Sequence, residues 1–129
     1  MKANTLALLA LIPTLVASPM SAKADDKHDH GAIYGGQFVE VEGHHGVEMV
    51  SDATSIAFYL SEEHKPMVLT GGSFKVIIQN GSDTKIVPLT IDGNKLSAKL
   101  DAELPKGAKL AMSGKDAHGH TIQARFVKE

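Results

Sequence analysis

The histidines are the residues of this chain whose type and spacing could do chemistry. The chain has 129 residues, among them seven histidines and no cysteine. All but His64 fall into three close groups, and these are His28/His30, His44/His45 and His118/His120. Neutral imidazole is a common protein ligand for divalent transition metals. The pattern predicts a metal-binding protein, with zinc or copper as the favoured ion and nickel or cobalt as alternatives.

Two of the groups are His-x-His pairs. In an extended chain, residues i and i+2 point to the same side, so each pair is spaced to chelate one ion. His28 and His30 lie in the charged stretch "DDKHDH", where binding would have to order the chain at an entropic cost. His118 and His120 lie in a turn where Gly119 is expected to supply a positive φ, and the alternative there is a solvated hairpin turn.

The remaining pair lies in "GHHGVE" (43–48). Neighbouring residues on a strand point to opposite faces. His44 would therefore share an outer acidic face with Glu48, while His45 would lie at the mouth of the core face. One ion could bind both rings only if the flanking glycines broke the strand locally. Glu48 is a candidate carboxylate ligand, and the alternative for it is a solvated, salt-bridging surface.

Two further predictions concern single histidines. His120 has the same strand parity as Ile122, which places its side chain toward the core face at the mouth of the last strand. His64, in "EEHKPM", is interpreted as a surface residue and is not among the predicted ligands. The predicted metal ligands are therefore His28, His30, His44, His45, Glu48, His118 and His120.

The N-terminus has the features of an export signal. Lys2 is followed by an apolar run over 6–16 and then by Ala22-Lys23-Ala24, a small-x-small cleavage pattern. The run is too short to cross a bilayer. We expect a signal peptide over 1–24, cleaved after Ala24, and a periplasmic protein with a flexible His/Asp-rich tail and loop over 25–36. Because there is no cysteine to form a disulfide, the domain over 37–129 must rest on its core.

Alternating apolar and polar residues dominate the rest of the chain. The segments with this period are 37–42, 44–50, 54–60, 73–79, 84–91, 95–100, 108–113 and 120–127, and turn residues separate them. They predict an all-β fold, either an antiparallel, immunoglobulin-like β-sandwich or a small barrel of about seven to eight short strands. Pro88 cannot donate to a ladder, so we expect either that its strand lies at an edge or that Pro88 faces an unpaired side.

Composition excludes several classes of function. The formal net charge is −2, and a leader containing Lys2 and Lys23 would leave a more acidic chain, which argues against nucleic-acid binding. No nucleophile motif or phosphate-binding glycine loop is present, so we do not expect an enzyme. The alternative to a metal binder is a non-enzymatic interaction module whose histidines are incidental and whose edge strand accepts a partner.

A family resemblance spans nearly the whole chain after the leader. It is carried by "HDHGAIYGGQFVEVEGHHGVEMV", "IAFYLSEEHKPM", "KIVPLTIDGNKLSAKL" and "LPKGAKLAMSGKDAHGHTIQARF". The chain resembles small exported bacterial proteins that are similar to the N-terminal extension of periplasmic adaptor subunits of heavy-metal efflux pumps. The resemblance implies a β-sandwich-like domain linked to divalent metal handling, with such an adaptor as a possible partner. The chain lacks the adaptor itself and adds the pair His118/His120.

Overall fold

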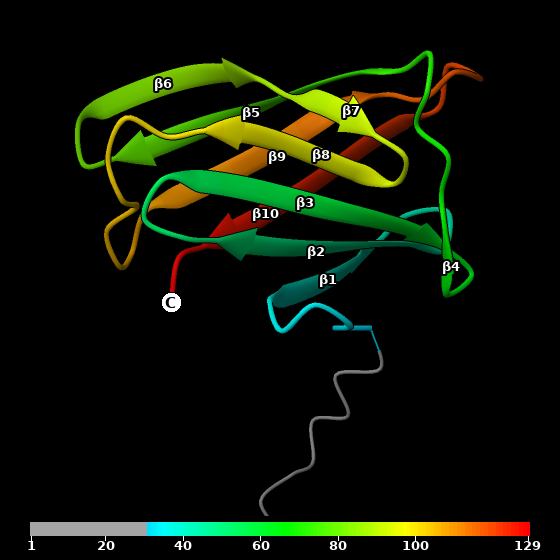
Figure 1. Ribbon diagram of the computed structural model, residues 1–129, viewed down its shortest axis with the longest axis horizontal. Helices are drawn as coiled ribbons and strands as arrows, with labels where there is room; N and C mark the ends of the chain where they lie inside the picture. The colour runs from blue at the N-terminus through cyan, green and yellow to red at the C-terminus, as the bar shows by residue number, and fades with distance from the viewer. Residues whose placement is uncertain (1–30) are drawn as a thin grey trace, which may run out of the picture.

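Two antiparallel sheets face each other in this protein. The computed structural model describes residues 31–129, and Figure 1 shows the two layers. The first sheet has the order β1-β2-β3-β8-β7, and the short strand β4 pairs with β3. Its strands are β1 (Gln37–Val41), β2 (His45–Ser51), β3 (Ser55–Glu62), β8 (Lys95–Lys99), β7 (Thr90–Asp92) and β4 (Lys65–Pro66).

The second sheet has the order β10-β9-β5-β6. Its strands are β10 (Thr121–Val127), β9 (Lys109–Lys115), β5 (Ser73–Asn80) and β6 (Asp83–Pro88). The prediction of an all-β, sandwich-like fold is confirmed, and the sheets stay separate rather than closing into a barrel. None of residues 31–129 belongs to a helix with the length and apolar character that a membrane crossing requires.

The core lies between the sheets and is built from the alternating apolar positions. Along β3, Ile56, Phe58 and Leu60 are fully buried, and along β10 the buried stripe is Ile122, Ala124 and Phe126. The rings of Phe58 and Phe126 meet across the sandwich with centroids 5.8 Å apart. Period-two patterning thus identified the inward faces correctly, because each strand buries one face.

Ten strands form instead of about eight, for two reasons. The predicted strand over 84–91 divides at Leu89, so that β6 belongs to the second sheet and β7 to the first. Pro88 ends β6 at the sheet edge, as expected from its missing N–H. In the irregular connection after β3, Lys65 and Pro66 return to pair with Glu62 and Ser61, forming β4.

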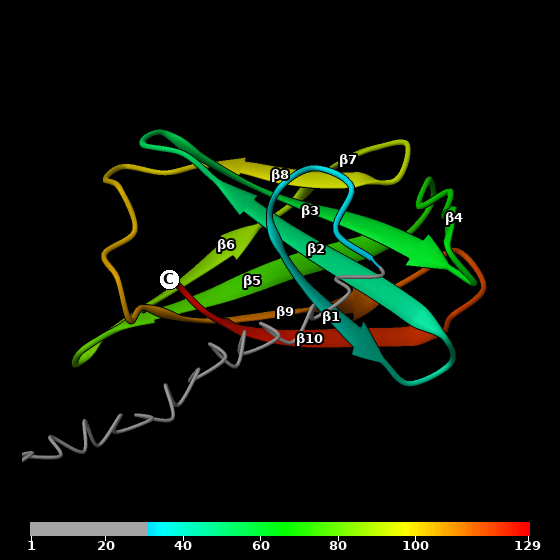
Figure 2. The same ribbon diagram turned by 90° about the horizontal axis from the view of Figure 1, so that it is seen from below.

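Residues 31–36 have no strand structure, yet they are held against the outer face of the first sheet. The ring of Tyr34 stacks on that of Tyr59 on β3, with centroids 3.7 Å apart and planes at 15°. Figure 2 shows this cyan segment crossing the sheet. The expectation of a flexible loop therefore does not describe 31–36, while the predicted leader and the tail over 25–30 lie outside the described residues.

Candidate metal-binding end

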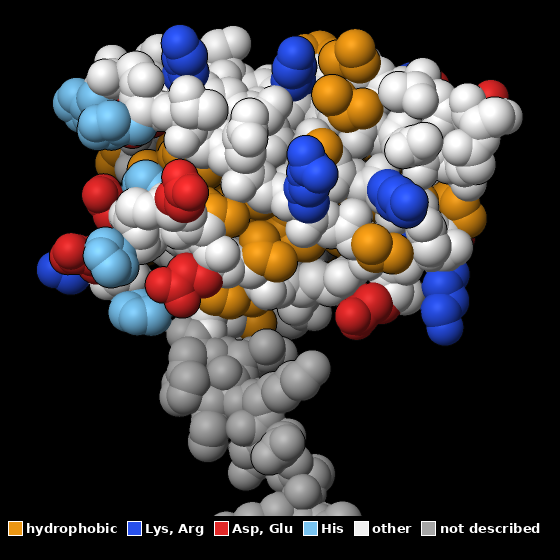
Figure 3. Space-filling view, turned by 180° about the vertical axis from the view of Figure 1, so that it is seen from behind, with side chains coloured by type: hydrophobic (Ala, Val, Ile, Leu, Met, Phe, Trp, Pro, Cys, Tyr) orange, Lys and Arg blue, Asp and Glu red, His pale blue; other side chains and the backbone are white. Residues whose placement is uncertain are grey.

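The histidine side chains of the described chain gather at one end of the sandwich, which we call the histidine end. Three turns supply them: the β1–β2 turn, the β3–β4 turn and the β9–β10 turn. Figure 3 shows the pale-blue imidazoles at this end, with carboxylates beside them. The residues are His44, His45, His64, His118 and His120. The chain thus brings two of the predicted groups, and His64, to the same end.

His45 is the first residue of β2 and points inward, with only 8% of its surface exposed. Its ring Nδ1 lies 2.9 Å from the carbonyl oxygen of Glu42. A carbonyl can only accept, so Nδ1 carries the proton and the lone pair of the neutral ring is on Nε2. Gly43 permits this turn through its φ of 81°, and a Cβ there would lie about 3.0 Å from the imidazole. His45 is therefore held at the mouth of the core face, where its strand parity had placed it.

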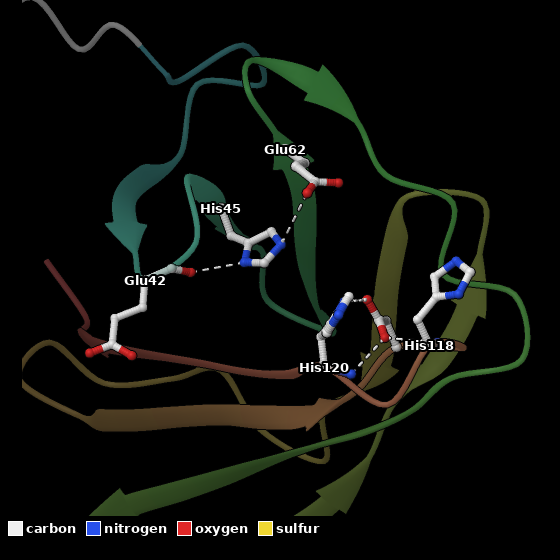
Figure 4. Close-up of polar contacts among 6 residues, drawn as sticks. Glu42, His45, Glu62, His118 and His120 are labelled. Carbon is white, nitrogen blue, oxygen red and sulfur yellow. Dashed lines mark hydrogen bonds and ion pairs between the residues drawn. The ribbon is translucent and has the colours of Figure 1, made fainter.

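The free nitrogen of His45 faces a carboxylate. Nε2 lies 3.9 Å from Oε1 of Glu62, the residue paired with His45 across the β2–β3 ladder. Figure 4 shows the imidazole between its two oxygen partners. The distance is too long for a hydrogen bond. It is slightly wider than the roughly 3.4 Å that separates two ligand atoms of one tetrahedral zinc ion.

Asp116 organises the β9–β10 turn. Its Oδ1 accepts the backbone N–H groups of His118 and His120, both at 2.9 Å, and its Oδ2 lies 3.1 Å from Nδ1 of His120. Burial acts to raise the pKa of this carboxyl group, but the amides of His120 and His118 outweigh it and hold the pKa below its usual value. Gly119 has φ 82°, which confirms its predicted role.

The two rings of this turn lie near each other at the surface. Their centroids are 6.2 Å apart, and the side chain of His120 is 68% exposed. β10 begins at Thr121, so His120 lies just outside the strand. The prediction that its side chain points toward the core is therefore wrong: the ring turns outward to the carboxylate of Asp116. Figure 4 shows the rings of His118 and His120 at this turn.

His45 and His120 share one chemical feature. In each, Nδ1 donates to an oxygen, a carbonyl for His45 and a carboxylate for His120, which leaves Nε2 as the free nitrogen. Metal-binding histidines in proteins commonly have such an outer oxygen partner, because it fixes the tautomer and the ring orientation. When the rings are neutral, each therefore presents Nε2 as the nitrogen that can bind a metal.

Glu48 does not lie on an outer acidic face, and that prediction is wrong. It is 2% exposed. Its Oε2 accepts the N–H of Ile33 at 2.7 Å, and its Oε1 accepts those of Tyr34 at 2.9 Å and Gly36 at 2.7 Å. The segment over 31–36 covers this face of the sheet, which strand alternation alone could not indicate. The carboxylate is occupied by backbone donors, so we leave Glu48 out of the proposed ligand set.

His44 lies on the outer side of the first sheet, as predicted, but strand parity is not the reason. It precedes β2 and has φ 60°, so the strand parity used to place it does not apply. Its side chain lines a surface hollow on the outer side of the first sheet, while His45 turns inward. The adjacent histidines therefore serve two different surfaces and do not form one chelating pair.

No preformed ion site exists within residues 31–129. No three His, Cys, Asp or Glu side chains in this range already surround a point where an ion could bind. His28 and His30 lie outside the described residues. The site residues that the sequence did not indicate as ligands or as their partners are Glu42, Glu62, His64 and Asp116, and of these His64 was interpreted as a surface residue. Of these, only Asp116 has a local signal, since an aspartate two residues before a His-Gly turn is placed to accept its backbone amides.

Comparison with known proteins gives little similarity. No family model matches the chain, and no curated protein matches it. Among solved structures, the "Br derivative BhCBM56" matches with a TM-score of 0.45 and 9% sequence identity, covering 71% of this chain and 100% of that one.

Proposed function

We propose that this protein reversibly binds a divalent transition metal, zinc or copper, through imidazoles at its histidine end. In an exported protein, such binding would serve as a periplasmic buffer, chaperone or sensor in metal homeostasis. The role is one of binding rather than catalysis. The ligand candidates are His45 and Glu62 at the core mouth, His118 and His120 at the β9–β10 turn, and His28 and His30 in the N-terminal segment.

The arrangement of Nδ1 and Nε2 in His45 and His120 is the observation that supports this proposal most. An incidental surface histidine has no need of a fixed tautomer, whereas a ligand benefits from one, because binding then does not have to orient the ring. For His120 the outer partner is a carboxylate at 3.1 Å that is itself fixed by two backbone amides.

Small side-chain movements would bring either pair, His45 with Glu62 or His118 with His120, to the spacing that one metal ion requires. The separation of 3.9 Å between His45 Nε2 and Glu62 Oε1 must close by about half an ångström for one zinc ion. Zinc–imidazole bonds of about 2.0–2.1 Å place two ring centres roughly 5 Å apart, so the rings of His118 and His120 must approach slightly from 6.2 Å. Water or another imidazole would supply the remaining positions.

Calorimetric titration of the exported, metal-free protein with Zn²⁺ and with Cu²⁺ tests the proposal. We expect a dissociation constant below ~10 μM for at least one ion and a weaker interaction as the pH falls through ~6.5, where protons compete for imidazole. His120→Gln should weaken binding at least tenfold. Thr121→Gln, an exposed neighbour, is the matched control. Affinity no tighter than ~10 μM for both ions would overturn the proposal.

The resemblance described above indicates where such a protein would act. A periplasmic adaptor of a metal-efflux pump is the partner that we propose, with delivery or withholding of the ion as the consequence. Loss of this protein should then change metal tolerance only in cells that have the pump. Equal tolerance with and without the protein would contradict this partner.

A second candidate function is protein interaction, and one surface favours it. The outward positions of β5, β6, β9 and β10 include Lys75, Lys109, Lys115 and Arg125, and no aspartate or glutamate is among these positions. The adjacent strand β6 has a free edge and an exposed Ile86. A basic face beside a free edge suits an acidic extended segment. Pull-downs test this function. It would be favoured if the wild type and a His28/His30/His118/His120 alanine variant recover the same protein and Lys109→Glu/Arg125→Glu does not.

A further inference from the structure

A surface hollow lies between the β1–β2 and β3–β4 turns, and we call it the turn pocket. Its volume is about 180 Å³, and two histidines and two glutamates are among the residues that line it. The lining residues are Phe38, Glu40, His44, Gly46, Ser61, Glu63 and His64. The pocket is on the outer side of the first sheet, whereas His45 points to the core side. It is therefore a different location from the pairs discussed above.

Unusual backbone conformations are concentrated at this pocket. Within residues 31–129, the non-glycine residues with positive φ are His44 at 60°, Glu63 at 48° and His64 at 66°. All three line the turn pocket. Such conformations cost on the order of 1–3 kcal/mol for a residue with a side chain, and they persist where the surrounding structure enforces them. Histidine tolerates this region better than most residues, but glutamate has no such explanation.

The two central residues of the β3–β4 turn are not those that make such a turn most stable. Glu62 pairs with Lys65, which leaves Glu63 and His64 as the two central residues, both with positive φ. Two-residue hairpins of this kind strongly favour Asn-Gly. The sequence instead places a glutamate and a histidine there, and both residues line the pocket. A function for these two side chains would explain the choice.

The two turns are held together by backbone contacts. The N–H of Glu63 donates to the carbonyl of His44 at 3.1 Å, so the residues that supply the imidazoles cannot separate freely. The floor between them depends on Gly46, where a Cβ would lie 2.6 Å from both the Phe38 ring and the hydroxyl oxygen of Ser61. A side chain at this position would fill the pocket. The backbones of the two turns are therefore held together, while the exposed side chains of His44 and His64 can turn about their χ angles.

We infer that His44 and His64 bind a second divalent transition-metal ion in the turn pocket, with Glu40 or Glu63 as the carboxylate ligand. Two imidazoles and a carboxylate are a common ligand set for zinc, with water completing the tetrahedron. Because no three of these groups already converge in the described structure, the rings must turn inward when the ion binds. Binding would hold the two turns together through their side chains as well as their backbones.

Titration of four proteins with Zn²⁺ tests this inference, which rests on the proposed function because it concerns the same ions. The variants are His44→Gln, His64→Gln and, as matched control, Lys65→Gln on the neighbouring exposed strand. We expect two binding events in the wild type. His44→Gln and His64→Gln should each weaken one event at least tenfold, while Lys65→Gln leaves both unchanged.

The outcomes separate this inference from the proposed function. If the wild type binds no ion, both fail. If His120→Gln weakens binding while His44→Gln and His64→Gln leave every event unchanged, only the turn-pocket site is overturned. Ring ¹⁵N chemical shifts give a second readout that does not depend on variant stability. Zinc should shift the imidazole nitrogens of His44 and His64 in the wild type, and unshifted nitrogens at saturating zinc would also overturn the inference.

Discussion

The carboxylate of Glu48, buried on β2, accepts the backbone N–H of Tyr34 at 2.9 Å. The same carboxylate accepts two further amides, from Ile33 and Gly36. One side chain therefore satisfies three donors of a segment that has no ladder of its own. The Tyr34 ring then lies on Tyr59, and Lys95 Nζ lies 5.9 Å from the Tyr59 ring centroid. This carboxylate therefore fixes the path of residues 31–36 across the outer face of the first sheet.

Replacing Glu48 with glutamine should release this segment. The amide nitrogen of glutamine would face an N–H donor, and the hydrogen bonds to a charged group would be lost, each worth about 1.5–3 kcal/mol. We expect the free energy of unfolding to fall by about 2–4 kcal/mol, measured by urea denaturation. Glu40→Gln, at an exposed position on β1, is the control and should change it by less than ~0.5 kcal/mol. Equal stability of both variants would contradict the assigned role.

Gly46 should not tolerate a methyl group, because the Phe38 ring and Ser61 Oγ occupy its space. We expect Gly46→Ala to lower the free energy of unfolding by about 1–3 kcal/mol through overpacking. A double-mutant cycle with Phe38→Ala isolates the cause. The alanine should be less harmful once the ring is gone, and an unchanged penalty in that background would show that Ser61 or the backbone, rather than the ring, is responsible.

Much of the fold could be predicted from residue alternation, because each strand buries one face. The stripe Ile122, Ala124 and Phe126 was identified in this way. The same rule correctly placed His45 inward with Val47. It failed for Glu48, because the segment over 31–36 covers the second face of β2 and makes that face a buried one too. Alternation indicates which residues share a face and carries no information about what covers it.

The candidate site was less predictable because it is formed by three turns distant in sequence. His44 leaves the strand as a result of φ 60°, which a single sequence does not show for a non-glycine residue. His64 joins His44 only because β4 folds back onto β3, and a two-residue strand is too short to produce a periodic signal. Asp116 was also missed, although the aspartate and Gly119 form a turn pattern that could have indicated it.

Asp116 should affect both the stability of the β9–β10 turn and the proposed binding of a metal ion. Asp116→Asn keeps the size of the side chain but removes the charge that the His118 and His120 amides stabilise. We expect a loss of about 1–3 kcal/mol in unfolding free energy and a weaker interaction with Zn²⁺, because the ring of His120 loses its orienting partner. Titration at a temperature well below unfolding separates the two effects. Unchanged affinity in a destabilised variant would make Asp116 purely structural.

The free energy of unfolding should fall at acid pH, in part because of Asp52 in the β2–β3 turn. Its carboxylate accepts the N–H groups of Thr54 and Ser55, and these bonds hold its pKa below the ordinary 3.8. A pKa that is lower in the folded state adds stability above about pH 3.8 and loses it as the pH falls through the folded value. Asp52→Asn lacks this titration. The stability gap between wild type and variant should therefore shrink between pH 5 and pH 2 in urea denaturation, and a constant gap would contradict the assignment.

The β3–β4 turn should become more stable when its proposed metal ligands are removed. Glu63→Asn/His64→Gly places the favoured Asn-Gly pair at two positions that already have positive φ. Glycine accepts this conformation without strain, so we expect the free energy of unfolding in the absence of metal to rise by about 1–2 kcal/mol. The same variant should lose the turn-pocket event in a zinc titration. A protein that is both more stable and unable to bind the second ion would show that the sequence keeps Glu63 and His64 for binding at the expense of stability. A destabilised variant would contradict the strain argument, and an intact second event would contradict the site.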